Sequence, residues 1–123
     1  MPRMNPEKTR VLVVDDYPQV LSFVRIGLRA RGYDVEVRDS GRAALEAARQ
    51  DVPDVILLDI RMPDLDGFEV IKQLREFCDC PIIAYSATPE FSERALEAGA
   101  EAFIPKPFEL DALLSTIDRV IKS

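Results

Sequence analysis

The chain has 123 residues, of which 47% are hydrophobic and 31% charged, a balance typical of one soluble globular domain. The formal net charge of −6 argues against a free-standing nucleic-acid-binding module and against adsorption to anionic membranes. No apolar run approaches the roughly 20 residues that span a bilayer, and the polar N-terminus lacks the core of a signal peptide. The sequence therefore predicts a cytoplasmic protein.

The N-terminal part of the chain predicts two strands, each followed by a helix. Residues 11–14 form a continuous apolar run, which is typical of a strand buried on both faces of a parallel sheet. A helix over 18–30 is indicated by a proline in its first turn and a glycine just beyond its end. Residues 34–38 alternate apolar and polar side chains and predict an edge strand. Ser40 is a candidate N-cap for a helix over 41–49.

The central part repeats this alternation. Residues 55–58 are the most continuous apolar run and predict a buried strand. Asp66 precedes a glutamate by three residues, the spacing of a capping box at a helix start. Residues 81–85 predict a fourth strand. Thr88 and the following proline open a further helix, which Gly99 closes.

The C-terminal part adds a short strand over 102–104 and a last helix with an apolar stripe at the helical period. The stripe comprises Leu110, Leu113, Leu114, Ile117 and Ile121. Alternating strands and helices with right-handed crossovers predict an α/β, doubly wound fold with helices on both faces of a parallel sheet. Residues 1–9 are predicted to be a flexible lead-in, and residues 10–123 to form a single domain.

Residues with chemical potential follow four of the predicted strands directly. They are Asp15 and Asp16 after the first, Asp59 after the third, Ser86 after the fourth and Lys106 after the fifth. Ligands of doubly wound sheets bind beyond the carboxyl ends of the strands, so these groups are expected to meet at one edge. Clustered carboxylates favour a hard cation, and a shallow all-oxygen site suits Mg²⁺. A carboxylate beside Mg²⁺ can accept a phosphoryl group, with Lys106 neutralising charge and Ser86 donating its hydroxyl.

Each group also has an ordinary structural interpretation. Asp15 and Asp16 could cap the first helix, and Asp59 with Lys106 could be a simple ion pair. The chain contains no histidine, which removes the usual base of Ser-His-Asp chemistry. Two cysteines, at 78 and 80, are expected to be small buried apolar side chains, because a disulfide between such near neighbours closes a very small ring.

Four motifs resemble the response-regulator receiver domain of two-component signalling. They are Val-Val-Asp-Asp at 13–16, Leu-Asp-Ile-Arg-Met-Pro-Asp-Leu-Asp-Gly at 58–67, Tyr-Ser-Ala at 85–87 and Lys-Pro-Phe at 106–108. In this order and at these spacings, over about residues 10–121, they form a specific signature. The resemblance implies a flavodoxin-like (βα)5 sheet with strand order 2-1-3-4-5 and a cis peptide between Lys106 and Pro107.

The resemblance also implies roles for the site residues. Asp59 is then the phosphoacceptor. Mg²⁺ is held by Asp16, Asp59 and the backbone carbonyl of Arg61, and by Asp15 either directly or through water. Ser86 is the switch hydroxyl, while Lys106 contacts the phosphoryl group. The implied donor is the phosphohistidine of a histidine kinase or a histidine phosphotransfer protein. A surface built from the fourth helix, fifth strand and fifth helix would signal to a downstream protein or output domain, as a monomer or a phosphorylation-dependent dimer.

This chain departs from the commonest pattern at two positions. Ser86 stands where threonine is more usual, and Phe103 stands where a tyrosine commonly swings inward; Phe103 can fill that pocket or be plain core. Arg61 and Thr88, two residues beyond Asp59 and Ser86, are hypothesised to tune dephosphorylation, with Arg61 covering the aspartyl-phosphate; a solvated arginine is the alternative.

Three rival functions remain at this stage. A phosphohydrolase of the haloacid-dehalogenase type also uses an Asp nucleophile and Mg²⁺, but its two acids lie two residues apart, whereas Asp15 and Asp16 are adjacent. A receiver that only binds partners would not need all the site residues. A flavodoxin-like cofactor binder would need a Gly-rich phosphate loop, which the sequence lacks. A non-enzymatic signalling domain is therefore favoured, assisting only its own phosphorylation and dephosphorylation.

Overall fold

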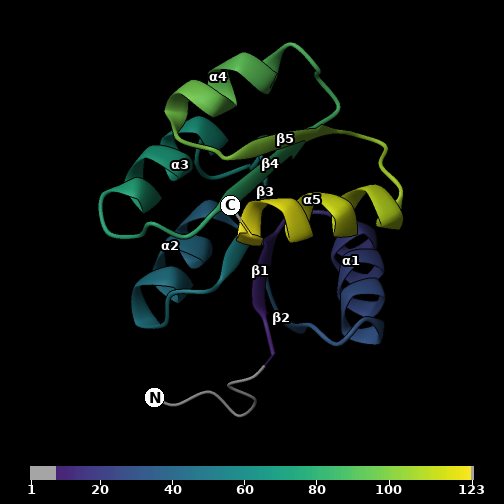
Figure 1. Cartoon of the computed structure of the whole chain (residues 1–123). Helices are drawn as coiled ribbons and strands as arrows, with labels where there is room; N and C mark the ends of the chain where they lie inside the picture. Colours follow the sequence, from purple (N-terminus) through teal and green to yellow (C-terminus); the bar gives the residue numbers. More distant parts are fainter. Residues whose placement is uncertain (1–7, 123) are drawn as a thin grey trace.

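The computed structural model describes residues 8–122, so most of the predicted lead-in lies outside the described residues. Strands and helices alternate along the chain (Figure 1). The strands are β1 (Arg10–Val14), β2 (Asp34–Arg38), β3 (Val55–Asp59), β4 (Ile82–Ser86) and β5 (Ala102–Pro105). The helices are α1 (Pro18–Ala30), α2 (Gly41–Gln50), α3 (Gly67–Arg75), α4 (Phe91–Ala98) and α5 (Leu110–Lys122).

The five strands form one parallel sheet in the order β2-β1-β3-β4-β5, which confirms the predicted doubly wound fold. The order reverses direction between β1 and β3. Figure 1 shows α1 and α5 on one side of the sheet and α2, α3 and α4 on the other. This arrangement leaves the carboxyl ends of β1 and β3 side by side, which is where doubly wound sheets bind ligands.

Alternate residues of each central strand enter two separate cores. Leu12, Ile56 and Ile82 pack with α2, α3 and α4, whereas Val13 and Leu57 pack with α1 and α5. All five are nearly or fully buried. Burial on both faces explains why these strands read as continuous apolar runs, and it makes the sheet a rigid base for the residues that follow its strands.

The predicted helix starts are confirmed at α2 and α3. The Ser40 Oγ accepts the Ala43 N–H at 3.2 Å, and Asp66 Oδ1 accepts the Phe68 N–H at 2.8 Å. Both bonds satisfy donors that the first turn of a helix leaves unpaired. Gly99 ends α4 with a φ of +126°, a conformation that glycine adopts without steric cost.

Two details of the predicted helices are wrong. Helix α4 begins at Phe91, because residues 88–91 form a turn in which Thr88 O accepts the Phe91 N–H at 3.1 Å. In α5 the fully inward position of the last turn is Val120, which is 7% exposed, whereas Ile121 is 38% exposed. Contact with the sheet decides which side of α5 faces inward. The apolar pattern of the sequence placed that side correctly except in the last turn, where it was one residue off.

The cysteines pack in the core as predicted, with Cys78 4% exposed and Cys80 partly buried, but the expectation that they are unpaired is wrong, because the two form a disulfide. Their Cα atoms are 5.6 Å apart, a separation that disulfides commonly bridge. The Arg75 Nη1 donates to the carbonyls of Cys78 at 3.2 Å and Cys80 at 2.6 Å, which folds this turn before β4. None of the helices within residues 8–122 combines the length and apolar character that a membrane span requires.

Candidate functional site at the carboxyl edge of the sheet

The groups predicted to converge do meet at one edge of the sheet. Asp15 directly follows β1, Asp59 and Ser86 are the last residues of β3 and β4, and Lys106 directly follows β5. Parallel strands end at the same edge, so the four chain segments reach it without any long loop. A cavity of about 420 Å³ opens there, lined by Asp16 and Lys106 among others.

Three carboxylates form the floor of this site. Asp15, Asp16 and Asp59 each offer an oxygen, and these oxygens all lie within 4.8 Å of one another. Asp15 is fully buried, and Asp59 is 3% exposed. Negative charges this close and this poorly solvated repel, and the cluster therefore needs a nearby positive charge.

Lys106 supplies part of that charge. Its Nζ lies 3.0 Å from Asp59 Oδ2 and 3.3 Å from Asp15 Oδ2. Burial raises the pKa of Asp59 and the Asp15 charge adds to this, while the Lys106 contact lowers it; the pKa remains above its ordinary value. Burial alone would lower the pKa of Lys106, but its bonds to Asp59 and Asp15 raise that pKa overall. Lys106 therefore stays protonated.

One carboxylate oxygen in the cluster is left without a partner. The Asp16 Oδ1 is buried and accepts no hydrogen bond from any of the described residues. A buried anionic oxygen without a donor is costly, and a cation among the three carboxylates would satisfy it. Carboxylate oxygens are the ligands that Mg²⁺ prefers, so the donor set fits a hard divalent ion better than a soft one.

Hydroxyl and cationic side chains form the rim of the cavity. Ser86 is 1% exposed, and its Oγ accepts the Thr88 N–H at 3.1 Å. Arg61 is exposed; its Nη2 lies 3.4 Å from the Thr88 Oγ1, and its guanidinium lies 5.7 Å from the centre of the Phe91 ring. Arg61 thus reaches from the β3–α3 loop to the start of α4, beside the cavity mouth.

The backbone after β3 is fixed by a close approach. The Arg61 N–H donates to Asp59 Oδ1 at 3.1 Å, and the Gly67 N–H donates to Ile60 O at 3.0 Å. A Cβ on Gly67 would lie 2.5 Å from the Ile60 Cα, so the position requires glycine. Asp64 accepts the Gly41 and Arg42 N–H groups at 2.9 and 3.0 Å and ties this loop to the start of α2.

Sequence reasoning missed one contact of the site. Tyr85 is 1% exposed, and its hydroxyl donates to Asp15 Oδ2 at 2.9 Å. Burial and the neighbouring Asp15 charge raise the pKa of Tyr85 well above its ordinary value, so its hydroxyl remains a donor. The only signal in the sequence was a polar atom within an otherwise apolar strand. Phe103, the predicted switch aromatic, is partly buried against the core beneath α2, α3 and α4.

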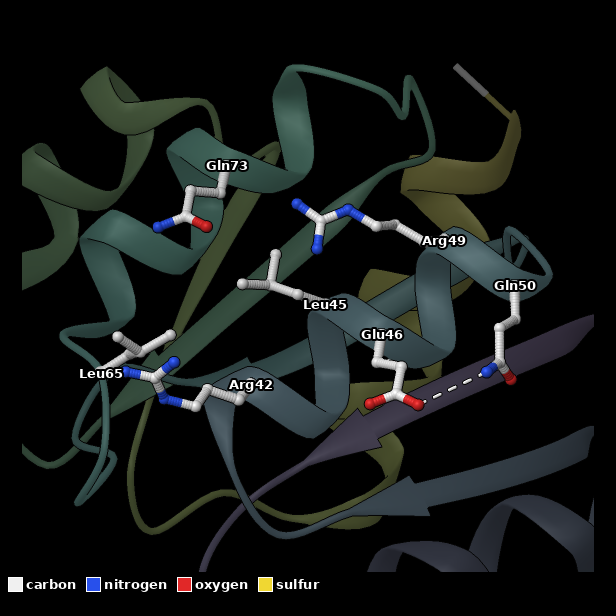
Figure 2. Close-up of a pocket in the computed structure, with 7 residues that line it drawn as sticks. All are labelled: Arg42, Leu45, Glu46, Arg49, Gln50, Leu65 and Gln73. Carbon is white, nitrogen blue, oxygen red and sulfur yellow. Dashed lines mark hydrogen bonds between the residues drawn. The ribbon is translucent and has the colours of Figure 1, made fainter.

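A larger hollow lies away from these groups. It measures about 550 Å³ and lies between α2 and α3 (Figure 2). Its walls are exposed and partly buried helix side chains, including Arg42, Arg49 and Gln73, over Leu45 and Leu65. No strand-end group reaches it, so size alone does not identify the functional site here, and the chemistry lies in the smaller cavity.

The comparisons with known proteins agree with this geometry. Residues 11–118 match the family model described as the response regulator receiver domain. The chain is 40% identical over 116 residues to the Transcriptional regulatory protein KdpE of Mycobacterium tuberculosis, covering 93% of this chain and 51% of that protein. The chain therefore spans about half the length of this curated relative.

Solved structures show the same fold. The chemotaxis protein CheY4 of Vibrio cholerae matches with a TM-score of 0.84 and 35% identity, over 92% of this chain and 98% of that one. A CheY-like response regulator receiver domain protein from Methanospirillum hungatei matches with a TM-score of 0.88 and 28% identity, over 94% and 95%. With the motifs, the fold and the strand-end cluster in place, these matches show that the chain belongs to the response-regulator receiver domain family of two-component systems.

Proposed function

We propose that the chain is a phosphoacceptor switch. It takes a phosphoryl group onto Asp59 from a phosphohistidine of a histidine kinase or phosphotransfer protein, with Mg²⁺ bound at the acidic cluster. The observation that carries this proposal is the buried, unpartnered Asp16 Oδ1 beside Asp15 and Asp59, with Lys106 opposite. Family membership supports a role in two-component signalling in the cytoplasm.

The residues of the cluster divide the work of the transfer. Asp16, with Asp15, Asp59 and the Arg61 carbonyl, would hold Mg²⁺, which supplies charge neutralisation for the entering phosphoryl group. The bond between phosphorus and the donor imidazole breaks as the bond to an Asp59 oxygen forms. Lys106, 3.0 Å from Asp59 Oδ2, is placed to pair with a phosphoryl oxygen.

The phosphoryl group would then be sensed through Ser86. Its Oγ now accepts the Thr88 N–H and has a proton to donate to a phosphoryl oxygen. Movement of Ser86 toward the phosphoryl group would draw the loop before α4 with it. The proposed output surface comprises α4, β5 and α5, and Phe103 of β5 would fill the space that this loop vacates. The switch is then a shift between two populations.

Arg61 and Thr88 would set how long the phosphorylated state lasts. The Arg61 guanidinium lies at the cavity mouth, held by Thr88 and the Phe91 ring. The same side chain can turn over the Asp59 carboxylate once that group carries added negative charge, and it would then obstruct the approach of water. The contacts to Thr88 and Phe91 compete with that position.

The direct test is incubation with acetyl phosphate, with and without Mg²⁺, followed by intact mass measurement. The protein is expected to gain one phosphoryl group only when Mg²⁺ is present, and the Asp59→Asn variant is expected to gain none. Asp118→Asn, at an exposed helix position paired with Lys122, is the matched control and should behave as the wild type. A wild-type protein that gains no mass, or gains it equally without Mg²⁺, would refute the proposal.

The same samples separate the rival functions. A haloacid-dehalogenase-type hydrolase would turn over a chromogenic phosphate ester many times, whereas a receiver should show essentially no turnover. A receiver that serves only as a binding module would show neither turnover nor a mass gain.

A further inference from the structure

Tyr85 places a phenol beneath the acidic cluster. It is in β4, next to Ser86 in the chain but on the opposite face of the sheet, where it packs in the core formed with α1 and α5. Its backbone is fixed by β3, since the Ile60 N–H donates to Tyr85 O at 3.0 Å. Only the hydroxyl of this buried side chain reaches the functional site.

The ring has little freedom to move. Phe108 packs edge-on against it, with 5.4 Å between ring centroids. The Lys106 Nζ lies over the ring at 5.0 Å from its centre. The hydroxyl is within hydrogen-bond distance of Asp15 Oδ2, at 2.9 Å, and of Val14 O, at 3.2 Å. The charged Asp15 oxygen is the nearer and stronger of the two acceptors.

Asp15 is oriented by this contact and two others. Its Oδ1 accepts the Tyr17 N–H at 2.9 Å, so one oxygen is held by backbone and the other by the Tyr85 hydroxyl. Lys106 also contacts Oδ2, at the longer distance of 3.3 Å, but its shorter contact is to Asp59. Without the phenol, the Asp15 carboxylate would keep only the Tyr17 bond and a lysine that it shares with Asp59.

We propose that Tyr85 is a positioning residue of the Mg²⁺ site, whose hydroxyl fixes the Asp15 carboxylate so that it faces the same point as Asp16 and Asp59. Partners that hydrogen-bond metal-ligating carboxylates set ligand orientation, and their loss typically lowers metal affinity about 10–100-fold. Phenylalanine or an aliphatic residue would fill the same space and supply no donor. The inference rests on the proposed function, since it requires that the cluster bind Mg²⁺.

The test is titration with Mg²⁺ alone, followed by backbone amide NMR shifts, for the wild type and Tyr85→Phe. The dissociation constant is expected to rise by about tenfold or more in Tyr85→Phe. Tyr33→Phe, which removes a hydroxyl from a tyrosine outside the site, should bind as the wild type. Asp16→Asn should lose most of its binding. The Mg²⁺-induced rise in melting temperature gives a second measure of affinity if Tyr85→Phe is only marginally folded.

A double-mutant cycle with Asp15→Asn asks whether Tyr85 acts through that carboxylate. If it does, adding Tyr85→Phe to Asp15→Asn should cost little further affinity. Unchanged affinity in Tyr85→Phe, or an undiminished loss in the Asp15→Asn background, would overturn the inference. A wild-type protein that binds no Mg²⁺ would instead refute the metal site of the proposed function.

Discussion

The acidic cluster predicts that the metal-free protein is more stable without the charge of Asp59. Asparagine at this position keeps the shape of the side chain, but its single amide oxygen can accept only one of the two hydrogen bonds that the Asp59 oxygens accept from Arg61 and Lys106. The substitution removes one negative charge from a group of three, of which Asp15 and Asp59 are buried and Asp16 is partly buried. Asp59→Asn is therefore expected to raise the free energy of unfolding in the presence of a chelator.

The size of this effect follows from the distances. The ligand oxygens of Asp15, Asp16 and Asp59 lie within 4.8 Å of one another, and at that upper distance, with an effective dielectric constant of about 20, each of the two neighbours repels Asp59 by about 3.5 kcal/mol. Attraction to Lys106 at 3.0 Å offsets about 5.5 kcal/mol of that repulsion. The electrostatic balance favours asparagine by about 1.5 kcal/mol, and the loss of one hydrogen bond offsets about 1 kcal/mol of this, so a rise in melting temperature of about 2 °C is expected for a domain of this size.

Thermal unfolding followed by circular dichroism, with chelator or with Mg²⁺, measures this balance. Mg²⁺ at a hundredfold excess over its dissociation constant should stabilise the wild type by about 2.7 kcal/mol. The Asp59→Asn variant has lost a ligand and should respond much less. The gap in stability between the two metal-free proteins should therefore narrow or reverse when Mg²⁺ is added.

The dependence on pH has a defined sign. Burial and the Asp15 charge raise the pKa of Asp59 in the folded protein above its ordinary value of 3.8, so the folded state binds the proton more tightly than the unfolded state. The cost of ionised Asp59 is present above the folded-state pKa and disappears as the pH falls toward 3.8. The reasoning would be refuted if the metal-free Asp59→Asn variant were less stable than the wild type at pH 7. It would also be refuted if the difference in unfolding free energy between the two proteins grew as the pH fell.

Four further outcomes are expected. Arg61→Ala should shorten the half-life of the aspartyl-phosphate about fivefold, because lowering the activation free energy of its hydrolysis by about 1 kcal/mol has an effect of that size. An unchanged or longer half-life contradicts this. Ser86→Ala should still be phosphorylated but should lose most of the phosphorylation-dependent amide shifts in α4, and wild-type shifts would overturn the coupling. Asp64→Ala should cost about 1 kcal/mol of unfolding free energy at neutral pH, because two backbone N–H groups lose their acceptor. Asp64 is exposed, and although slight desolvation raises its pKa, those bonds lower it overall, so this loss should diminish as the pH falls from 3.8 through the lower folded-state pKa. A loss that persists below that range contradicts the assignment. Gly67→Ala should cost about 3 kcal/mol in urea unfolding, because its Cβ would lie 2.5 Å from the Ile60 Cα; an unchanged midpoint would show that the backbone relaxes.

The elements could be predicted from sequence wherever burial dictated the residue type. Residues 55–58 had to be apolar throughout because helices cover both faces of the sheet, and the structure buries all of β3. The edge strand β2 alternates because one face is only partly covered. Once the strands were located, the meeting of Asp15, Asp59 and Lys106 followed from parallel topology alone.

Contacts between distant segments could not be predicted in the same way. The bond from Tyr85 to Asp15 joins residues 70 apart, and nothing in the local pattern distinguishes this phenol from a core aromatic. The late start of α4 depends on the turn at Thr88. The turn of Cys78 and Cys80 is held by Arg75, and the same side chain donates to Gly99 O at 2.9 Å, so the surroundings of the disulfide depend on a contact with a distant segment.

The electrostatics of the cluster also explain why a phosphoryl group on Asp59 would change the conformation and not merely the charge. Near Asp59, the positive charge comes from Lys106, which already contacts two carboxylates, and from Arg61 at the rim. A phosphoryl group adds negative charge to a site whose fixed donors are already engaged, so its new oxygens need further donors. Ser86 and Ala87, where β4 ends, line the same cavity as Asp59, and the Ser86 hydroxyl and the N–H groups of this loop would be further donors. Under the proposed function, recruiting them would displace the start of α4, and phosphorylation of Asp59 would thereby be coupled to a surface beyond the reacting atoms.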